Sequence, residues 1–191
     1  MRGAKAEQRY RLLFERHWRR VLAYSYRRIG DELSAEDVAA EVFTVAWRRI
    51  SEIPPEHELA WLIGVARRVL ANFWRSQARR DRMIQRVGTE TYIRERFLET
   101  EPGGLQELYG EALRTAMASL RPIDVEVLRL ALWEDLTHLE IAMIFGCKPG
   151  TVAVRLHRSR ERLRIELIKA ISETGYKIMG ESSDTVREAG L

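Results

Sequence analysis

Apolar residues recur every three or four positions along most of the chain, whereas the alternation typical of strands is scarce. This periodicity predicts an all-α protein, built as two small helical domains joined by a flexible linker. The first helical domain is expected over residues 8–87, with helices at 10–29, 35–50 and 58–86. Ser34 with Asp37 three residues later predicts a capping box at the start of the second helix, and Pro54 and Pro55 predict its end.

The second helical domain is expected over residues 111–172, beginning with helices at 111–120 and 122–132. Between the domains, residues 88–110 lose the helical spacing, hold five acidic residues against two arginines, and contain a Pro-Gly-Gly breaker. We interpret this segment as a flexible acidic linker with room for a helical turn or two. Residues 173–191 are rich in Ser, Gly, Glu and Asp, so a disordered tail is expected there.

Two more helices after residue 136 have the pattern of a helix-turn-helix. Thr137 and Glu140 predict a capping box, and Pro149 suits the first turn of the next helix. A small contact residue, a left-handed turn residue and a buried branched residue are expected at Ala142, Gly146 and Val152. The apolar side of the first helix is expected to comprise Leu139, Ile141, Ala142 and Ile144. Because the second helix is rich in arginine, DNA binding is favoured over an ordinary αα-hairpin with a solvated basic face.

A second basic surface is predicted on the helix at 58–86, where residues 67–86 hold seven arginines and one acid. Helical spacing places one polar stripe at Arg68, Asn72, Arg75, Arg79, Arg82 and Arg86. An apolar arc lies beside and opposite it at Leu62, Val65, Ala66, Val69, Leu70 and Phe73. Such a helix can pack on one side and follow a phosphate backbone on the other. Trp61 and Trp74 lie near the borders of the stripe, where they either complete the core or stack on unpaired bases.

The helix at 35–50 has a different surface. Its packing stripe is Val38, Val42, Val45 and Ala46. Phe43 and Trp47 project away from this stripe, and Glu36, Asp37 and Glu41 add negative charge nearby. Large aromatic residues rimmed by acids suit docking onto a partner protein. The alternative is that the core face of this helix is wide and includes these aromatic residues.

Composition narrows the function classes. The chain has 191 residues, a formal net charge of +4 and an isoelectric point near 9.4, which suggests a polyanionic partner. No apolar run is long enough to span a membrane and no hydrophobic signal region is visible, so a cytoplasmic protein is expected. No enzyme, metal site or cofactor is expected, because the four histidines are scattered and Cys147 is the only cysteine. Cys147 itself is expected to be a small buried residue rather than a nucleophile or redox switch.

Three segments carry a resemblance to a known family: AEDVAAEVFTVAWRR (35–49), AWLIGVARRVLANFWRSQARR (60–80) and LTHLEIAMIFGCKPGTVAVRLHRSRERLR (136–164). In this order they resemble the extracytoplasmic-function (ECF) sigma factors of the sigma-70 family, which direct bacterial RNA polymerase to promoters. The resemblance implies a sigma-2-like first domain and a sigma-4-like second domain. It further implies that the acidic linker threads toward the active-site cleft and RNA exit channel of the polymerase, whose β flap and β′ clamp helices would be partners.

The resemblance also implies roles for residues. The residues implied to dock on the β′ clamp helices are Asp37, Glu41, Phe43, Trp47 and Arg48. The residues implied to bind and melt the promoter −10 element are the loop 52–58 and Trp61, Arg67, Arg68, Asn72, Arg75 and Arg79. Reading of the −35 element falls to Lys148, Thr151, Ala153, Val154, Arg155 and Arg158. An anti-sigma protein that covers both helical domains is a further partner that the family implies.

Two departures from the family pattern lie in the recognition helix. Ala153 and Val154 stand where the family commonly has polar or basic residues. Apolar side chains can contact thymine methyl groups but cannot make bidentate contacts to guanine. We therefore predict a −35 preference different from the AAC-containing motif that is commonest in the family. The rival interpretation is a stand-alone helix-turn-helix regulator, which would account for residues 111–172 but not for the docking face or the arginine stripe of the helix at 58–86.

Overall fold

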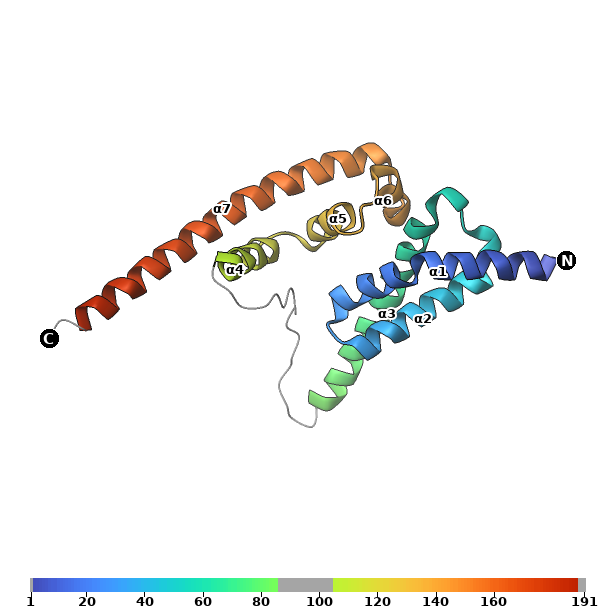
Figure 1. Cartoon of the computed structure of the whole chain (residues 1–191), viewed down its shortest axis with the longest axis horizontal. Helices are drawn as coiled ribbons and strands as arrows, with labels where there is room; N and C mark the ends of the chain where they lie inside the picture. Colours follow the sequence, from blue (N-terminus) through green and yellow to red (C-terminus); the bar gives the residue numbers. More distant parts are fainter. Residues whose placement is uncertain (1, 86–104, 189–191) are drawn as a thin grey trace. The chain divides into compact units, whose positions relative to one another are not determined.

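The computed structural model describes the backbone of residues 2–85 and 105–188, and the side chains of 3–80 and 110–172. Within these ranges all regular structure is helical (Figure 1), which confirms the predicted fold class. The chain divides into two compact units. The first contains α1 (Arg2–Ile29), α2 (Glu32–Arg48), the short 3-10 turns η1 (Ile50–Glu52) and η2 (Pro55–His57), α3 (Glu58–Gln85) and α6 (His138–Phe145). The second contains α4 (Leu105–Ala118), α5 (Pro122–Leu132) and α7 (Pro149–Glu188).

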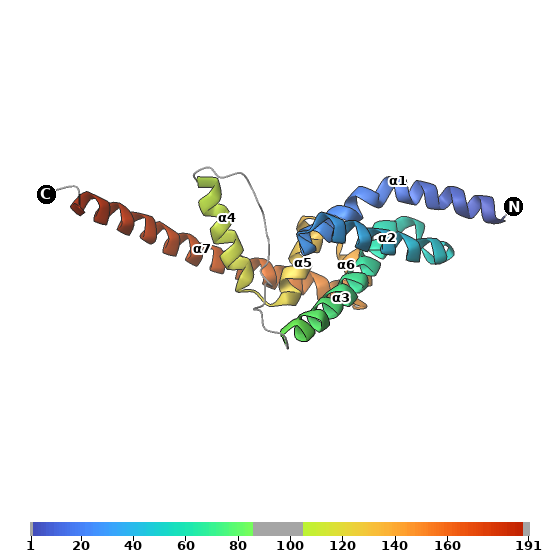
Figure 2. The ribbon, with the colours of Figure 1, turned by 90° about the horizontal axis from the view of Figure 1, so that it is seen from below.

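The core of the first unit lies between α1, α2 and α3. Figures 1 and 2 show α1 and α2 side by side, and α2 also packs against α3. Each helix contributes fully buried side chains, among them Leu13, Val21 and Tyr24 from α1, Val38, Val42 and Phe43 from α2, and Leu62, Ile63 and Ala66 from α3. The predicted apolar stripes of α2 and α3 are thus the faces that are buried, apart from Val45 and Phe73, which are half-buried.

The start of α2 differs from the prediction. Its N-cap is Asp31, whose side-chain Oδ2 accepts a hydrogen bond of 2.9 Å from the backbone N–H of Ser34. Hydrogen bonds from the side chain of Ser34 and then from its backbone N–H lower the pKa of Asp31. Gly30 has φ +75°, a left-handed conformation that lets the chain turn from α1 into this cap. The predicted Ser34–Asp37 capping box was therefore wrong, because a better cap three residues earlier satisfies the first turn.

Other boundaries of the first unit agree to different degrees. α3 begins at Glu58 as predicted, and its described part ends at Gln85. α1 ends at Ile29 as predicted but begins at Arg2, eight residues before the expected start. α2 ends at Arg48 and the chain continues as the 3-10 turn η1, so the expected α-helix to residue 50 is slightly too long. The apolar pattern locates helix interiors well and helix ends poorly, because end residues carry little of the pattern.

The helix α6 completes the first unit by packing on α3. A Cβ atom built at Gly64 of α3 would lie 3.9 Å from the Ile144 side chain. The Glu140 carboxylate lies 3.5 Å from the His57 ring at the start of α3. Burial by itself would raise the pKa of Glu140, but hydrogen bonds from Thr137, and then from His57, lower it.

The second unit joins α4 and α5 to the first half of α7. Its buried apolar side chains include Ala112, Ala116, Val125, Leu128 and Leu156. α5 has the predicted bounds, with Pro122 in its first turn. α4 begins at Leu105 rather than at residue 111, so the last residues of the predicted linker, 105–110, form the helical turns for which the prediction left room. The rest of the predicted linker, residues 88–104, lies outside the described residues.

A buried carboxylate ties α5 to α7. Asp124 is 1% exposed and accepts hydrogen bonds from Arg121 at 2.8 and 3.1 Å and from Arg162 of α7 at 2.7 Å. The bonds from Arg121 are the main cause that lowers the pKa of Asp124, so this carboxylate is ionised at neutral pH. A charge in this position is tolerated because both of its oxygens are paired.

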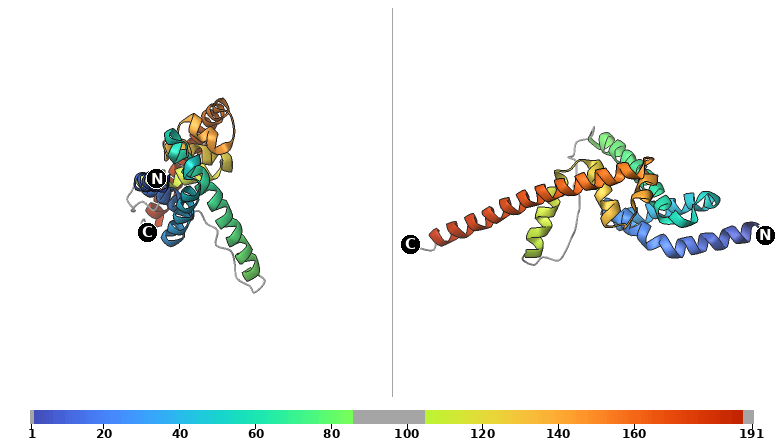
Figure 3. Two further views of the ribbon diagram at one scale, coloured as in Figure 1. Left: turned by 90° about the vertical axis from the view of Figure 1, so that its right-hand side faces the viewer. Right: turned by 90° about the horizontal axis from the view of Figure 1, so that it is seen from above.

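α7 is one continuous helix to Glu188 (Figure 3), so the disordered tail predicted from residue 173 was wrong over 173–188. Residues 189–191 lie outside the described part. Glycines such as Gly175 and Gly180 each cost a helix about 1 kcal/mol. Extending a helix that has already formed requires no new nucleation, however, so a polar composition does not by itself end the helix.

We predict that Phe43→Ala lowers the free energy of unfolding of the first unit by about 3–5 kcal/mol, because it removes a fully buried ring. Chemical denaturation followed by tryptophan fluorescence measures this change, since Trp18 and Trp47 lie in the same aromatic cluster. Leu33→Ala, in the same helix but 74% exposed, is the matched control. A loss of less than about 1 kcal/mol for Phe43→Ala would contradict the burial of this ring.

Candidate nucleic-acid interface

The first helix of the helix-turn-helix begins as predicted. The Thr137 hydroxyl accepts a hydrogen bond from the Glu140 N–H at 3.3 Å, and the Glu140 carboxylate accepts one from the Thr137 N–H at 2.9 Å. This reciprocal pair is the capping box. Of the expected apolar side, Ile141 and Ala142 are buried and Ile144 is half-buried, whereas Leu139 is exposed and was assigned wrongly.

The turn after α6 also confirms its prediction. Gly146 has φ +64° and ψ +39°, and the N–H of Cys147 donates to the carbonyl of Ala142 at 3.0 Å. This left-handed residue ends α6 and leaves two residues before α7 begins at Pro149. Val152, expected to be buried, is buried in the first turn of α7.

The predicted −35 residues divide into exposed and partly covered side chains. Lys148 lies in the turn, and it is exposed, as are Thr151, Val154 and Arg158 of α7. Ala153 and Arg155 are half-buried. Val154 is 52% exposed, so its branched apolar side chain is accessible to a ligand.

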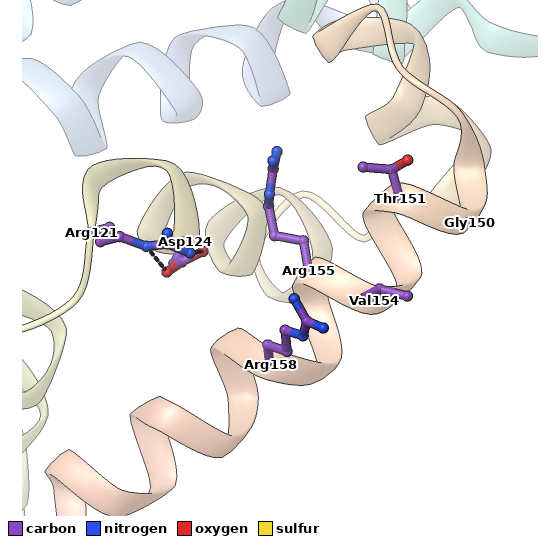
Figure 4. A pocket seen from close by; sticks show the side chains of 7 residues that line it. All are labelled: Arg121, Asp124, Gly150, Thr151, Val154, Arg155 and Arg158. Carbon is purple, nitrogen blue, oxygen red and sulfur yellow. Dashed lines mark hydrogen bonds and ion pairs between the residues drawn. The ribbon is translucent and has the colours of Figure 1, made fainter.

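A hollow of about 510 Å³ lies beside this part of α7 (Figure 4). Its lining comprises Arg121, Asp124, Gly150, Thr151, Val154, Arg155 and Arg158. Arg121 is the N-cap of α5 and Asp124 lies in its first turn, and neither was among the predicted site residues. The spacing of Arg121 and Asp124 by three residues at a helix start is a local signal that could have found the pair. Their position beside α7 is a tertiary contact that the spacing does not reveal.

The predicted basic stripe of α3 is exposed to solvent. Arg68, Asn72, Arg75 and Arg79 all lie on the surface, while the arc of Leu62, Val65, Ala66, Val69 and Leu70 is buried and Phe73 is half-buried. The side chains of Arg82 and Arg86 lie outside the described residues. The division of α3 into a packing side and a positively charged side is therefore confirmed as far as residue 79.

Hydrogen bonds orient two of these arginines along the helix. The Arg68 Nε donates to the Gly64 carbonyl at 3.1 Å, and the Arg75 Nε donates to the Ala71 carbonyl at 3.2 Å. Arg75 also donates to the side chain of Asn72. Bonds through Nε leave other guanidinium N–H groups of both side chains for a ligand.

The remaining predicted −10 residues are engaged with other side chains. The guanidinium of Arg67 lies 4.5 Å from the ring centroid of Phe145 in α6. Trp61 is half-buried, with the Arg49 guanidinium 5.7 Å from its ring. Trp74 is exposed, and its ring contacts that of Phe73 edge to face. Neither tryptophan is fully buried, so the core interpretation does not hold for Trp74 and holds only in part for Trp61.

The predicted docking residues do not all lie on the surface. Asp37, Glu41 and Arg48 are exposed, and Trp47 is 46% exposed with its ring 5.1 Å from that of Tyr10.

Phe43, in contrast, is 1% exposed and packs on Phe14 and Trp18, with ring centroids 4.9 and 5.6 Å away. The prediction that it projects from the core was wrong, because aromatic rings of α1 cover this side of α2.

Two histidines have acidic partners that sequence spacing did not reveal. The His17 Nε2 lies 3.2 Å from Glu58, although burial lowers the pKa of this histidine, and His57 faces Glu140. Cys147 is half-buried rather than buried as expected. In the described ranges there is no cluster of three or more His, Cys, Asp or Glu residues suited to a metal ion. No helix there has the length and apolar character needed to cross a membrane.

Two family matches cover both arginine-bearing surfaces. Residues 13–80 match "Sigma-70 region 2", and residues 110–163 match "Sigma-70, region 4". The chain is 31% identical to the ECF RNA polymerase sigma factor SigE of Mycolicibacterium smegmatis, over 85% of this chain and 63% of SigE. It is 28% identical to the ECF RNA polymerase sigma factor BldN of Streptomyces coelicolor, over 77% of this chain and 56% of BldN. The chain thus spans less than two thirds of either relative.

Solved structures share the fold of this chain. The sigma factor RpoE of Bartonella quintana, solved in complex with the anti-sigma factor NepR, matches with a TM-score of 0.59 and 21% identity, over 84% of this chain and 96% of RpoE. CnrH, solved with the cytosolic domain of CnrY, matches with a TM-score of 0.56 and 19% identity, over 86% of this chain and 95% of CnrH. At these identities the likeness concerns the fold. Because two sigma-70 regions fill more than half of the chain and its relatives are ECF sigma factors, the chain belongs to the sigma-70 family, in the ECF group.

Proposed function

We propose that this protein is an initiation factor that gives RNA polymerase its choice of promoter. It would bind the core enzyme, read the −35 element through α7 and hold the melted −10 element on α3. The observation that carries this proposal is the pair of arginine surfaces, one on each unit and each backed by a buried apolar side. A single helix-turn-helix would account for only one of them.

The charge of the α3 surface suits a single DNA strand. Opening a duplex costs roughly 1.4 kcal/mol for each stacked step. Arginines that hold the backbone, and aromatic rings that stack on unpaired bases, can offset this cost. Arg68, Arg75 and Arg79 are exposed for the first role, and the exposed Trp74 and the half-buried Trp61 are the candidates for the second. No catalytic group is required for this process, because melting is driven by binding.

Docking on core polymerase is assigned to the exposed side of α2. Asp37, Glu41 and Arg48 repeat at helical spacing and form one charged face, with Trp47 at its border. A half-exposed tryptophan beside charged residues has the composition of an interface anchor. Phe43 supports this face from below through its contacts with the aromatic rings of α1. The partners that we propose on the polymerase are the β′ clamp helices for this face and the β flap for the second unit.

We also propose that an anti-sigma protein restrains the protein until it is needed. Support comes from RpoE of Bartonella quintana, whose fold is similar and which was solved with its anti-sigma factor NepR. A pull-down from unstressed cells that recovers polymerase subunits alone would count against this part of the proposal.

Run-off transcription with core polymerase on templates with randomised promoter sequence tests the function. We expect defined transcripts only when both the protein and core enzyme are present, and no shift of the same duplexes by the protein alone. Tight binding of duplex DNA without polymerase, and no transcripts with it, would instead support the stand-alone regulator.

The same selection tests the role of the apolar recognition residues. Val154 is exposed on α7, so we expect the selected −35 elements to be rich in thymine and to differ from the AAC-containing motif. Replacing the contacted thymine by deoxyuridine should weaken binding by about fourfold, the value of one buried methyl group. Val154→Ala holoenzyme should be insensitive to that replacement. Recovery of the AAC-containing motif would exclude this reading of the helix.

A third test concerns docking. Trp47→Ala should weaken binding to core polymerase by roughly tenfold or more, because an interface tryptophan commonly contributes about 2 kcal/mol. Competition against a labelled wild-type chain measures the change. Trp74→Ala, a tryptophan of similar exposure on α3, is the matched control and should leave core binding unchanged. Equal affinity of the Trp47→Ala and wild-type chains would show that α2 docks elsewhere or not at all.

A further inference from the structure

The hollow beside α7 holds a concentration of positive charge. Thr151, Arg155, Arg158 and Arg162 are spaced by four, three and four residues, so they lie on one face of the helix. The first three line the hollow and Arg162 continues the row. Figure 4 shows the side chains of Arg155 and Arg158 on the side of α7 where Arg121 and Asp124 lie.

Arg121 occupies the opposite wall of the hollow, and its orientation is fixed. Its Nε and Nη2 both donate to Asp124, at 2.8 and 3.1 Å. Asp124 is buried and immobilised by a further bond of 2.7 Å from Arg162. Arg121 itself remains 63% exposed at the side chain, so its other guanidinium N–H groups face solvent. Because this planar guanidinium is already held in one orientation, it loses little conformational entropy when it binds a ligand.

The charges leave a strong preference for an anion. Three arginines and one carboxylate line the hollow, and both oxygens of that carboxylate, Asp124, already accept hydrogen bonds from Arg121 or Arg162. The hollow also includes Thr151 and Val154, which belong to the predicted −35 readers. An anion bound here therefore lies next to the DNA sequence that α7 reads. A phosphate of the DNA backbone has the matching charge and geometry, and arginine binds it with two parallel hydrogen bonds.

We propose that Arg121 is a DNA-contacting residue outside the recognition helix, and that it holds a backbone phosphate at the edge of the −35 element together with Arg155 and Arg158. Asp124 acts as a positioning residue that aims Arg121, and the hydrogen bond from Arg162 holds Asp124 in place. The proposal deepens the proposed function and rests on it. The contact from Arg121 at the start of α5 orients the protein on the duplex, and Thr151, Val154 and their neighbours select the bases.

The test uses holoenzyme assembled from the full chain and core polymerase, on a promoter duplex from the selection above. The dissociation constant is measured over a series of salt concentrations for wild type, Arg121→Ala and Arg121→Lys. Arg160→Ala is the matched control, because Arg160 is exposed on the far side of α7 from the hollow and its loss removes the same charge. Thermal unfolding of each variant shows whether the second unit is intact.

For Arg121→Ala we expect binding weakened by about three- to tenfold, equally for matched and mismatched −35 sequences. The slope of log affinity against log salt should become shallower by about 0.9, the value of one lost phosphate contact. Arg121→Lys should restore most of the slope, since a lysine also neutralises a phosphate. Arg160→Ala should retain the wild-type slope.

Two results would overturn the proposal. One is a wild-type salt slope for Arg121→Ala, even with a lowered melting temperature, because a purely structural ion pair would change stability and not the slope. The other is an equal loss of slope in Arg160→Ala, which would indicate general attraction and no site. Failure of the proposed function is distinct from both: wild-type holoenzyme would then bind without any dependence on the −35 sequence.

Discussion

The structure depends on helices that bury one side and keep a row of arginines in water on the adjoining side. In α3 the buried arc from Leu62 to Leu70 anchors the helix, and Arg68, Arg75 and Arg79 stay exposed. In α7 the residues Val152, Leu156 and Ser159 are buried, and the row of Arg155, Arg158 and Arg162 lies beside them. Because guanidinium groups cannot be deprotonated in proteins, neither row can lose its charge, and burial of the apolar side keeps both rows fixed in space.

The two rows are supported in different ways. α3 is held by a broad aliphatic and aromatic core shared with α1 and α2, so its arginines need few polar partners. α7 packs in a smaller unit, where the buried Asp124 connects it to α5 through two arginines. An ionic tie of this kind contributes little net stability but specifies geometry. In the proposed function, the surface that reads one register of a duplex has more need of fixed geometry than the one that holds a flexible strand.

Features that depend on near neighbours in the chain could be predicted from the sequence. The capping box of Thr137 and Glu140, the left-handed Gly146 and the amphipathic division of α3 are all local, and all are present. Features that depend on a second neighbouring helix could not be predicted from the sequence. Phe43 lies off the valine stripe of α2, yet α1 covers it, and periodicity within one helix cannot report how many neighbours that helix has. The meeting of Arg121, Asp124 and Arg162 and the pairing of His17 with Glu58 are hidden for the same reason.

The central claim is that the arginines of α7 bind a closed promoter while those of α3 hold it open. Permanganate, which oxidises unpaired thymines, separates the two steps when it is combined with a binding assay on the same promoter. Holoenzyme carrying Arg75→Ala should bind the duplex nearly as well as wild type but lose permanganate reactivity at the −10 element. Holoenzyme carrying Arg158→Ala should bind the duplex more weakly than wild type. Its permanganate reactivity should fall only by the same factor as its binding. If Arg75→Ala opened the promoter as fully as wild type, or if both variants failed at the same step, the division of labour between the two helices would be contradicted.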